Sequence, residues 1–341
     1  MTVTAFTNST GLGPLPRLLE AAGGSRMLTR VFQSENLPLS LASGEANWIP
    51  LRSLLGLFER SAAMLGDDLI GLRVGQAMQP EDFGLWARYG MSGATLRDKI
   101  LRSNRGLRFH QTGGELALDV RGEIAVWRYS MADPATYGRR HHAEHILWPM
   151  LTALRRHTSA KWDPIRIECS YERPPCWRQL EVAFGAPLVF GKAANAIVFK
   201  RHLLEDATTH VMPLEMQVTC GDILRMARRR PPTTILEATR AVVRTRIAEP
   251  LTDIEGTARL LGMSPRTLQR NLGEENFTFR EVLEQVRMER ALELLQDTTV
   301  SITEIAFSLG YDDATSFSRA FRRWAGYSPN HVRQAPPSSA K

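Results

Sequence analysis

The stretch Ile302-Thr-Glu-Ile-Ala-Phe-Ser-Leu-Gly-Tyr311 decides the fold of the C-terminal part of this 341-residue chain, because an earlier stretch has the same pattern. Its isoleucine, alanine, leucine and glycine recur 48 residues earlier, at Ile254, Ala258, Leu261 and Gly262. The alanine is small enough for two helices to cross, and the glycine suits a turn with positive φ. An apolar pair with a spacing of four residues follows each copy, at an offset of 49 residues. The repeat predicts two helix-turn-helix motifs.

The segment between the two copies predicts one long helix. Residues 278–296 contain no glycine or proline, and Thr278 and Glu281 have the spacing of a capping box. A helix of this length spans about 28 Å. We expect a rigid spacer that holds two recognition helices about one DNA turn apart. Its two apolar stripes lie on nearly opposite sides, the first made by Phe279, Val282, Leu283 and Val286 and the second by Met288, Ala291, Leu292 and Leu295.

The first recognition helix is expected at residues 265–274, where Leu268 and Leu272 lie on the inward side. The opposite side carries Arg266, Gln269 and Arg270 at i, i+3 and i+4 spacing. Arginine pairs well with guanine and glutamine with adenine in the major groove. This helix is therefore expected to carry most of the direct base readout.

The second recognition helix is expected at residues 313–324, with shorter side chains toward the groove. Its predicted buried residues are Phe317, Ala320, Phe321 and Trp324, and its outward residues are Thr315, Ser318, Arg319 and Arg322. Arginines that contact phosphates fix the position of a protein on DNA without reading sequence. We expect Arg319, Arg322 and Arg323 to hold phosphates and so to position the second motif.

The net charge of +7 gives little support for DNA binding by itself, because the excess lies elsewhere. Residues 1–224 hold 25 basic and 22 acidic side chains, residues 225–233 hold four and none, and residues 234–341 hold 14 and 14. The DNA-binding prediction therefore depends on where the C-terminal arginines point. A charged face of an ordinary helical bundle is the alternative interpretation, and the presence of two matched copies argues against it.

Domain boundaries follow from the segment Arg225-Met-Ala-Arg-Arg-Arg-Pro-Pro-Thr233, where a basic run meets two prolines. We predict a sensor and dimerisation domain over residues 1–224, a linker over 225–233, a DNA-binding domain over 234–335 and a tail over 336–341. The first domain is expected to be α+β, because helix and strand patterns interleave around a hairpin at Arg121 and Gly122. Helices are expected at residues 52–65, 96–109, 139–157 and 176–184, and strands at 116–120, 124–129, 165–171 and 196–200.

Composition limits the class of protein further. With 43% apolar and 23% charged residues, the chain can bury one or two cores. No apolar run is long enough to span a membrane, and the first 16 residues lack the pattern of a signal peptide. The three cysteines contain no CxxC pair. These features favour a cytoplasmic protein in a reducing compartment.

Several chemical alternatives have weak signals. His141, His142 and His145 lie on one predicted helix, where His141 and His145 share a face as two zinc ligands would. No third ligand at a suitable spacing accompanies that pair. A polar helix face, or a polar patch of an effector pocket, is therefore favoured over a metal site. Cys169 is expected to be a buried, inert thiol. No P-loop, GxGxxG or GxSxG pattern occurs, so neither an enzyme nor a cofactor is expected. Aromatic residues that could line a pocket, but are more often core, are Trp86, Tyr89, Trp127, Trp148 and Trp162.

Beyond these patterns, residues 234–335 resemble the AraC/XylS family of transcription regulators. The resemblance is carried by Arg290-Ala-Leu-Glu-Leu-Leu, by Phe317-Ser-Arg-Ala-Phe-Arg-Arg-Trp-Ala-Gly-Tyr-Ser-Pro329, and by the two turn regions described above. It implies a seven-helix DNA-binding domain, with Val332 standing where an aromatic residue is usual. The DNA-contacting residues that it and the helix patterns imply are Arg266, Thr267, Gln269, Arg270, Ala314, Thr315, Ser318, Arg319, Arg322 and Arg323.

The N-terminal part resembles the accessory domain of the subgroup that includes ornithine-utilisation regulators. The matching residues include Asp82-Phe-Gly-Leu85 and Phe184-Gly-Ala-Pro-Leu-Val-Phe-Gly191. The resemblance implies a domain that binds an unidentified small effector and can form a homodimer, in a regulator that activates transcription and works with RNA polymerase. Two alternatives remain open. The N-terminal part could only dimerise, or it could be an enzyme such as a DNA-repair methyltransferase, against which three dispersed cysteines argue.

Overall fold

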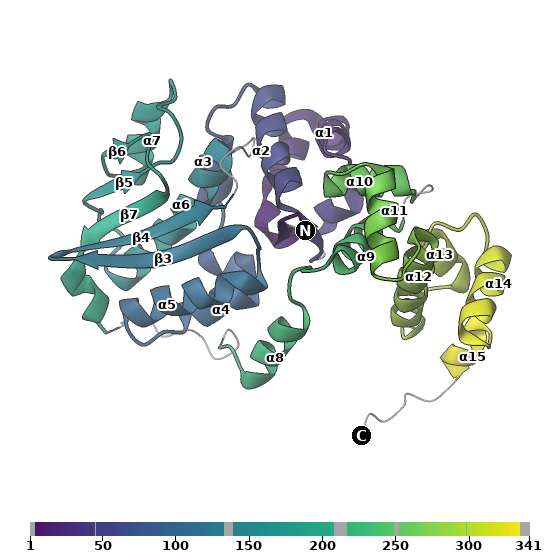
Figure 1. Cartoon of the computed structure of the whole chain (residues 1–341). Helices are drawn as coiled ribbons and strands as arrows, with labels where there is room; N and C mark the ends of the chain where they lie inside the picture. The colour runs from purple at the N-terminus through teal and green to yellow at the C-terminus, as the bar shows by residue number, and fades with distance from the viewer. Residues whose placement is uncertain are drawn as a thin grey trace. The chain divides into compact units, whose positions relative to one another are not determined.

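The computed structural model describes residues 4–44, 46–132, 139–207, 217–248, 252–297 and 299–334. The chain divides into two compact units. Ala5–Glu35 and Leu39–Pro231 form one unit, and the residues from Pro232 onward form most of the other (Figure 1). In the described part of the chain, no helix is long and apolar enough to cross a membrane.

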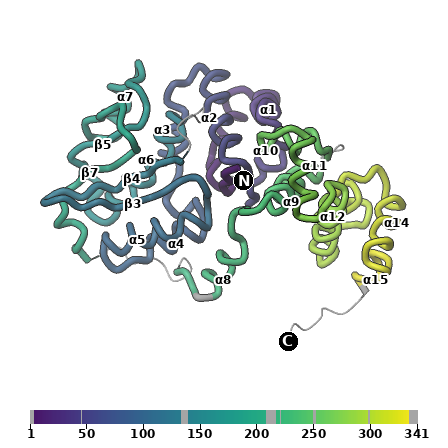
Figure 2. The backbone as a smooth tube through the Cα atoms, viewed as in Figure 1, coloured from purple at the N-terminus to yellow at the C-terminus, as the bar shows by residue number. Residues whose placement is uncertain are grey.

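The first unit contains a five-stranded sheet with strand order β3-β4-β7-β5-β6. The hairpin β3 (Gly114–Arg121) and β4 (Ile124–Met131) turns at Gly122, where φ is 55°. β7 (Asn195–Lys200) pairs antiparallel with both β4 and β5 (Arg166–Glu168), and β6 (Leu188–Val189) pairs parallel with β5. Figure 2 follows the backbone through this sheet. A separate two-stranded sheet joins β1 (Phe6–Asn8) and β2 (Trp48–Pro50).

Helices occupy the four ranges expected for them, near residues 52–65, 96–109, 139–157 and 176–184, and α4 and α8 form two further helices that were not predicted. α2 has its C-cap at Gly66 in the left-handed region, and α5 begins at its Thr95 cap. α6 packs against α3 and β7, and its apolar residues join the core beneath the sheet. The α-helices of this unit are α1 (Leu15–Ser34), α2 (Leu51–Leu65), α3 (Ile70–Gln76), α4 (Leu85–Met91), α5 (Leu96–Gly106), α6 (Arg139–His157), α7 (Trp177–Phe184) and α8 (Cys220–Arg228). Short 3-10 helices include η3 (Pro80–Phe83) and η4 (Leu107–Phe109).

The α+β prediction is confirmed, but some predicted elements differ in extent. The strand expected over residues 165–171 is limited to β5, because residues 170–174 leave the sheet before α7 begins. The first four residues of the expected linker belong to α8, since Thr219 and Asp222 form a capping box that starts a helix there. The tail expected at 336–341 lies outside the described residues.

The second unit is all-α, and its described residues form seven helices, as the family resemblance implied. These are α9 (Ile235–Arg246), α10 (Ile254–Leu261), α11 (Pro265–Glu274), α12 (Phe279–Leu295), α13 (Ile302–Ser308), α14 (Ala314–Ala325) and α15 (Pro329–Gln334). α12 contacts α9 near one motif, and α13, α14 and α15 in the other. The long spacer helix is confirmed, with Thr278 and Glu281 as its capping box.

Candidate DNA-binding site

The two motifs have the same turn geometry. After α10, Gly262 has φ 75° and Met263 N donates to Ala258 O at 3.0 Å. After α13, Gly310 has φ 72° and Tyr311 N donates to Ala306 O, also at 3.0 Å. Both alanines are fully buried where the helices meet. The repeat in the sequence is therefore a repeat in backbone structure.

Each recognition helix begins at a side-chain cap. Ser264 Oγ accepts from Thr267 N at 3.1 Å to start α11, and Asp313 Oδ1 accepts from Ser316 N at 2.7 Å to start α14. Proline at the first position of α11 needs no hydrogen-bond acceptor, so it fits a helix start. The hydroxyl of Thr267 lies 2.8 Å from Ser264 Oγ, so this predicted DNA contact also stabilises the cap.

The exposed face of α11 carries the side chains that were predicted for it. Arg266, Gln269 and Arg270 are exposed, whereas Leu268 and Leu272 are fully buried. Arg266 has no hydrogen-bond or ion-pair partner among the described residues. Arg270 Nε lies 3.8 Å from the carboxylate of Glu274, and both side chains are exposed. Such an exposed pair is weak and can open when a stronger partner approaches.

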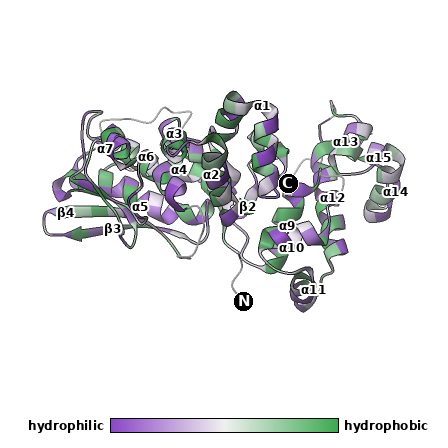
Figure 3. Ribbon diagram, turned by 90° about the horizontal axis from the view of Figure 1, so that it is seen from above, coloured by the Kyte–Doolittle hydropathy of each residue, from purple (hydrophilic) through white to green (hydrophobic). Residues whose placement is uncertain are grey.

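The outward face of α14 is different. Thr315 is exposed, and Ala314 and Ser318 are half-buried. Phe317, Ala320 and Phe321 are buried as predicted, but Trp324 is only half-buried. The prediction for Trp324 is wrong because this residue lies at the last turn, where its ring meets Tyr311 at 6.4 Å instead of the inner core. Figure 3 shows hydrophilic and hydrophobic residues interleaved along α14.

The three arginines of α14 have different partners. Arg322 has none among the described residues, and Arg319 Nη2 lies 3.4 Å from Ser316 Oγ. Arg323 Nη2 donates to Glu284 Oε1 of α12 at 2.9 Å. Arg280 Nε lies 3.3 Å from that same carboxylate oxygen. Arg322 is therefore the cation most available to a phosphate, and Arg323 also ties α14 to the spacer helix.

The histidine cluster of α6 does not form an exposed polar face, because His141, His142 and His145 are all buried. His145 Nε2 lies 3.3 Å from Met78 Sδ, while His141 lies 4.0 Å from Glu59 and 3.7 Å from Glu144. His141 and His145, which share one side of the helix, therefore contact different neighbours. In the part of the chain that the structure describes, no group of three His, Cys, Asp or Glu side chains is arranged to hold a metal ion.

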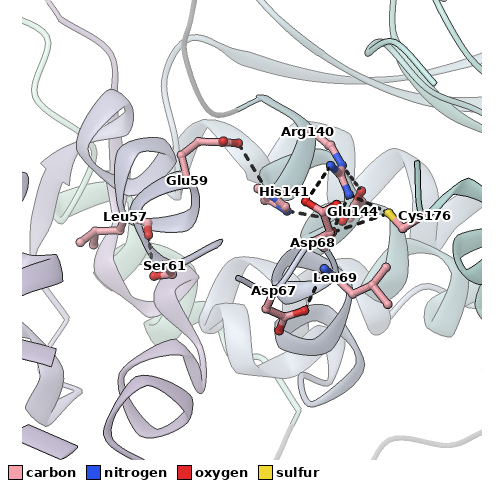
Figure 4. Close-up of polar contacts among 10 residues, drawn as sticks. All are labelled: Leu57, Glu59, Ser61, Asp67, Asp68, Leu69, Arg140, His141, Glu144 and Cys176. Carbon is pink, nitrogen blue, oxygen red and sulfur yellow. Dashed lines mark hydrogen bonds and ion pairs between the residues drawn. The ribbon is translucent and has the colours of Figure 1, made fainter. Parts of the chain in front are cut away.

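An ion cluster around the buried Glu144 lies in the first turns of α6 (Figure 4). Arg140 Nε donates to Glu144 Oε1 at 3.0 Å, and Arg140 Nη2 reaches the carbonyl of Asp68 at 2.5 Å and Cys176 Sγ at 2.8 Å. Glu144 is fully buried, so the arginine compensates its charge. The cluster joins α6 to the segment before α3 and to the cap of α7, which is a structural role.

Cys169 is fully buried, and burial raises the pKa of its thiol to about 12. A thiol in this state is not a nucleophile at neutral pH. The predicted burial of this cysteine is confirmed.

Comparisons with known proteins agree with this architecture. The model of the arabinose-binding domain of AraC transcription regulators matches residues 27–207, and a helix-turn-helix domain matches residues 257–335. Because the first match covers more than half of the chain, the protein belongs to the AraC family of transcription regulators. It is a DNA-binding regulator and not an enzyme.

Three relatives illustrate the range of similarity. The ornithine utilization regulator of Pseudomonas aeruginosa is 26% identical over 277 residues, which cover 80% of this chain and 81% of that protein. An uncharacterized HTH-type transcriptional regulator of Mycobacterium tuberculosis is 27% identical over 281 residues, 80% of each chain. The HTH-type transcriptional activator RhaS of Escherichia fergusonii is 38% identical over 86 residues, 25% of this chain and 31% of that protein.

Sequence reasoning missed one group of residues in the first unit. Phe83, His110 and Tyr129 line a pocket together with Trp86 and Trp127, two of the aromatic residues considered above. The signal in the sequence was the density of aromatic residues, but their convergence depends on contacts between distant segments.

Proposed function

We propose that this regulator is an activator controlled by a small molecule, in which Arg266, Gln269 and Arg270 read bases and Arg319, Arg322 and Arg323 hold phosphates. The observation that carries the proposal is the exposed, unpaired state of Arg266 and Arg322 on the two recognition helices. Thr267, Ala314, Thr315 and Ser318 complete the contact surface. Binding would engage two successive major-groove segments of promoter DNA.

Activation is supported by the name of one relative, which is an activator, and by the similarity of its helix-turn-helix region to this chain. An activator must also contact RNA polymerase, which we propose as a partner. Effector control is supported by the match to an arabinose-binding domain and by the pocket in the first unit. A homodimer in the cytoplasm completes the proposal. The proposed order of sensor domain, linker and DNA-binding domain is kept, with the linker shortened to residues 229–233 because α8 extends to Arg228.

The base-reading assignment is tested by measuring affinity for a footprinted promoter site and for random DNA. Arg266→Ala and Gln269→Ala should each cost about 1 to 3 kcal/mol on the specific site and relax the base preference there. Arg322→Ala should weaken both kinds of DNA alike. Arg105→Ala removes an exposed charge from the first unit and serves as a control. Equal losses on both kinds of DNA for all three DNA-face variants would contradict the assignment.

Effector control is tested on the same promoter by transcription with purified RNA polymerase. A metabolite panel that includes ornithine, because of the name of one relative, should contain a compound that changes transcript yield. Sedimentation with and without that compound would measure the oligomeric state. Unchanged transcription across a broad panel, with intact specific DNA binding, would favour a regulator whose first unit only dimerises.

A further inference from the structure

A pocket that opens to solvent lies in the first unit. Residues of η3, α4, α5, α6 and the β3–β4 hairpin line it. Phe83, Trp86 and Trp127 form aromatic parts of its wall, and Met91 and Met150 form apolar parts. A wall of this composition suits an apolar part of a small organic molecule.

The chemistry of the wall limits what can bind. None of the residues that line the pocket is Asp, Glu, Lys or Arg. A carboxylate or an ammonium group inside it would lose its hydration without gaining an opposite charge, which is strongly unfavourable. The pocket therefore selects against charged ligands, including free amino acids.

Most polar side chains in the wall already have partners. Ser103 Oγ donates to the Lys99 carbonyl at 2.8 Å, and Gln111 Nε2 donates to Tyr129 Oη at 2.6 Å. Tyr129 Oη also lies 3.1 Å from His142 Nε2, behind the wall. These bonds fix the polar groups in place before any ligand arrives.

Two polar groups of the wall, the His110 ring and Trp86 Nε1, have no hydrogen-bond partner among the described residues, and the His110 ring can both donate and accept. His110 is 4% exposed. The ring is packed between Trp86, with centroids 5.2 Å apart, and Phe83, at 5.7 Å. Burial, with a smaller contribution from His142, lowers its pKa to about 3, so the imidazole is neutral at pH 7. A neutral imidazole offers one donor and one acceptor to a ligand.

Phe83, Trp86 and His110 lie between two pockets. The same three residues line an adjacent pocket, whose other wall includes Arg225, Met226 and Arg229 at the end of α8. Met226 is buried there, and α8 contacts α4, which carries Trp86. Two residues separate the end of α8 from Pro231 and Pro232. One aromatic wall therefore separates the inner pocket from the helix that leads out of the first unit.

We propose that the inner pocket binds an uncharged aromatic or aliphatic molecule whose single polar group, a hydroxyl or a carbonyl, pairs with His110, and that this occupancy stabilises α8 through the wall of Phe83, Trp86 and His110. The inference rests on the proposed effector control and specifies its ligand class and its first step. A bound ligand would restrain the side chains of Phe83, Trp86 and His110 from the inner pocket. Met226 of α8 lines the pocket on the other side of these three residues.

Calorimetry on the full chain tests the ligand class with matched pairs of probes. 2-Phenylethanol is compared with phenylacetate, and 1-octanol with octanoate. We expect the alcohols to bind at least tenfold more tightly than the carboxylates. Preference for the carboxylates, or no binding of either alcohol, would overturn the proposal.

Variants then test the role of His110. His110→Phe keeps an aromatic ring and removes the polar group, so it should weaken alcohol binding at least tenfold. His110→Gln keeps a donor and an acceptor and should retain more affinity than His110→Phe. His157→Phe changes an equally buried histidine of α6 that lines neither pocket, and should bind as the parent does. Thermal unfolding of each variant separates lost binding from lost folding, and a folded His110→Phe protein with unchanged affinity would contradict the proposal.

Trypsin reports the coupling, because Arg225, Arg228 and Arg229 lie in and just after α8. Saturating 2-phenylethanol should slow cleavage at these sites at least threefold in the parent and leave His110→Phe unchanged. Equal cleavage with and without the alcohol would refute the coupling. Promoter binding that responds only to a charged metabolite would preserve effector control and overturn this ligand class, whereas binding that responds to no metabolite would overturn effector control itself.

Discussion

α11 and α14 start from side-chain caps and follow turns of the same geometry, but they present different side chains to solvent. With the offset of 49 residues, Arg266 corresponds to Thr315 and Gln269 to Ser318. The buried positions Leu268 and Leu272 correspond to phenylalanines that are equally buried. The repeat therefore preserves the buried positions that the fold needs, whereas the exposed positions differ, and the proposed function assigns base reading mainly to α11 and phosphate binding mainly to α14.

The largest expected effect concerns the shared core. Phe317→Ala removes a fully buried ring from the second motif and should lower the free energy of unfolding by about 3 to 5 kcal/mol. Leu268→Ala at the equivalent position should cost about 2 to 5 kcal/mol. Urea unfolding measures both values. Phe307→Ala is the matched control because Phe307 is 55% exposed, and a loss as large as that of Phe317→Ala would contradict the assigned core.

A second difference between the motifs is a buried arginine. Arg246 Nη1 lies 3.3 Å from Asp253 Oδ1 and 3.4 Å from Thr257 Oγ1, and the residue 48 positions later is Leu294. Arg246→Ala should therefore destabilise the first motif by about 1 to 3 kcal/mol, because buried polar partners lose their bonds. Arg244, on the same helix as Arg246, forms a more exposed pair with Glu293 of α12, so Arg244→Ala should cost less than about 1 kcal/mol.

The Arg246 network also gives a pH signature. Burial opposes ionisation of Asp253, but hydrogen bonds from Gly256 N and Arg246 outweigh it, so the pKa of Asp253 is lowered in the folded state. A lowered pKa stabilises the fold above the unfolded value, near 4, and that contribution is lost as the pH falls through the folded value. Arg246→Ala should therefore show a smaller loss of stability between pH 5 and pH 3 than the parent. An identical pH dependence in both proteins would show that the pair is not responsible.

Two substitutions would transfer the exposed face of α11 to α14. Thr315→Arg combined with Ser318→Gln gives α14 the side chains of α11 at equivalent positions. Selection from random DNA should show a new base preference in the second half of the site, with each good contact discriminating by about 1 to 3 kcal/mol. The first half should not change. A preference that shifts equally in both halves would contradict separate reading by the two motifs.

The sequence predicted the C-terminal unit better than the N-terminal one for a physical reason. α11 and α12 follow from caps, glycines and 3.6-residue periodicity, which are local signals. β1 and β2 have three residues each, and their pairing joins Phe6 with Pro50, so no local pattern predicts them. The burial of His142 and the exposure of the His110 ring to a pocket arise in the same way, from segments that meet only in the folded chain.

The smallest expected effect compares the two caps. Ser264→Ala should lower the free energy of unfolding by about 1 kcal/mol at any pH between 3 and 7, because a hydroxyl cap does not titrate in that range. Asp313→Ala should destabilise the protein at pH 7, and the difference from the parent should shrink toward pH 3. The hydrogen bonds from Ser316 N and Ser316 Oγ lower the pKa of Asp313, so its contribution is present above the unfolded pKa near 4 and disappears as the carboxylate is protonated. Denaturant titrations of both variants at several pH values measure these differences. A pH-dependent Ser264→Ala effect, or a constant Asp313→Ala effect, would mean that the two recognition helices do not begin in the way that their caps indicate.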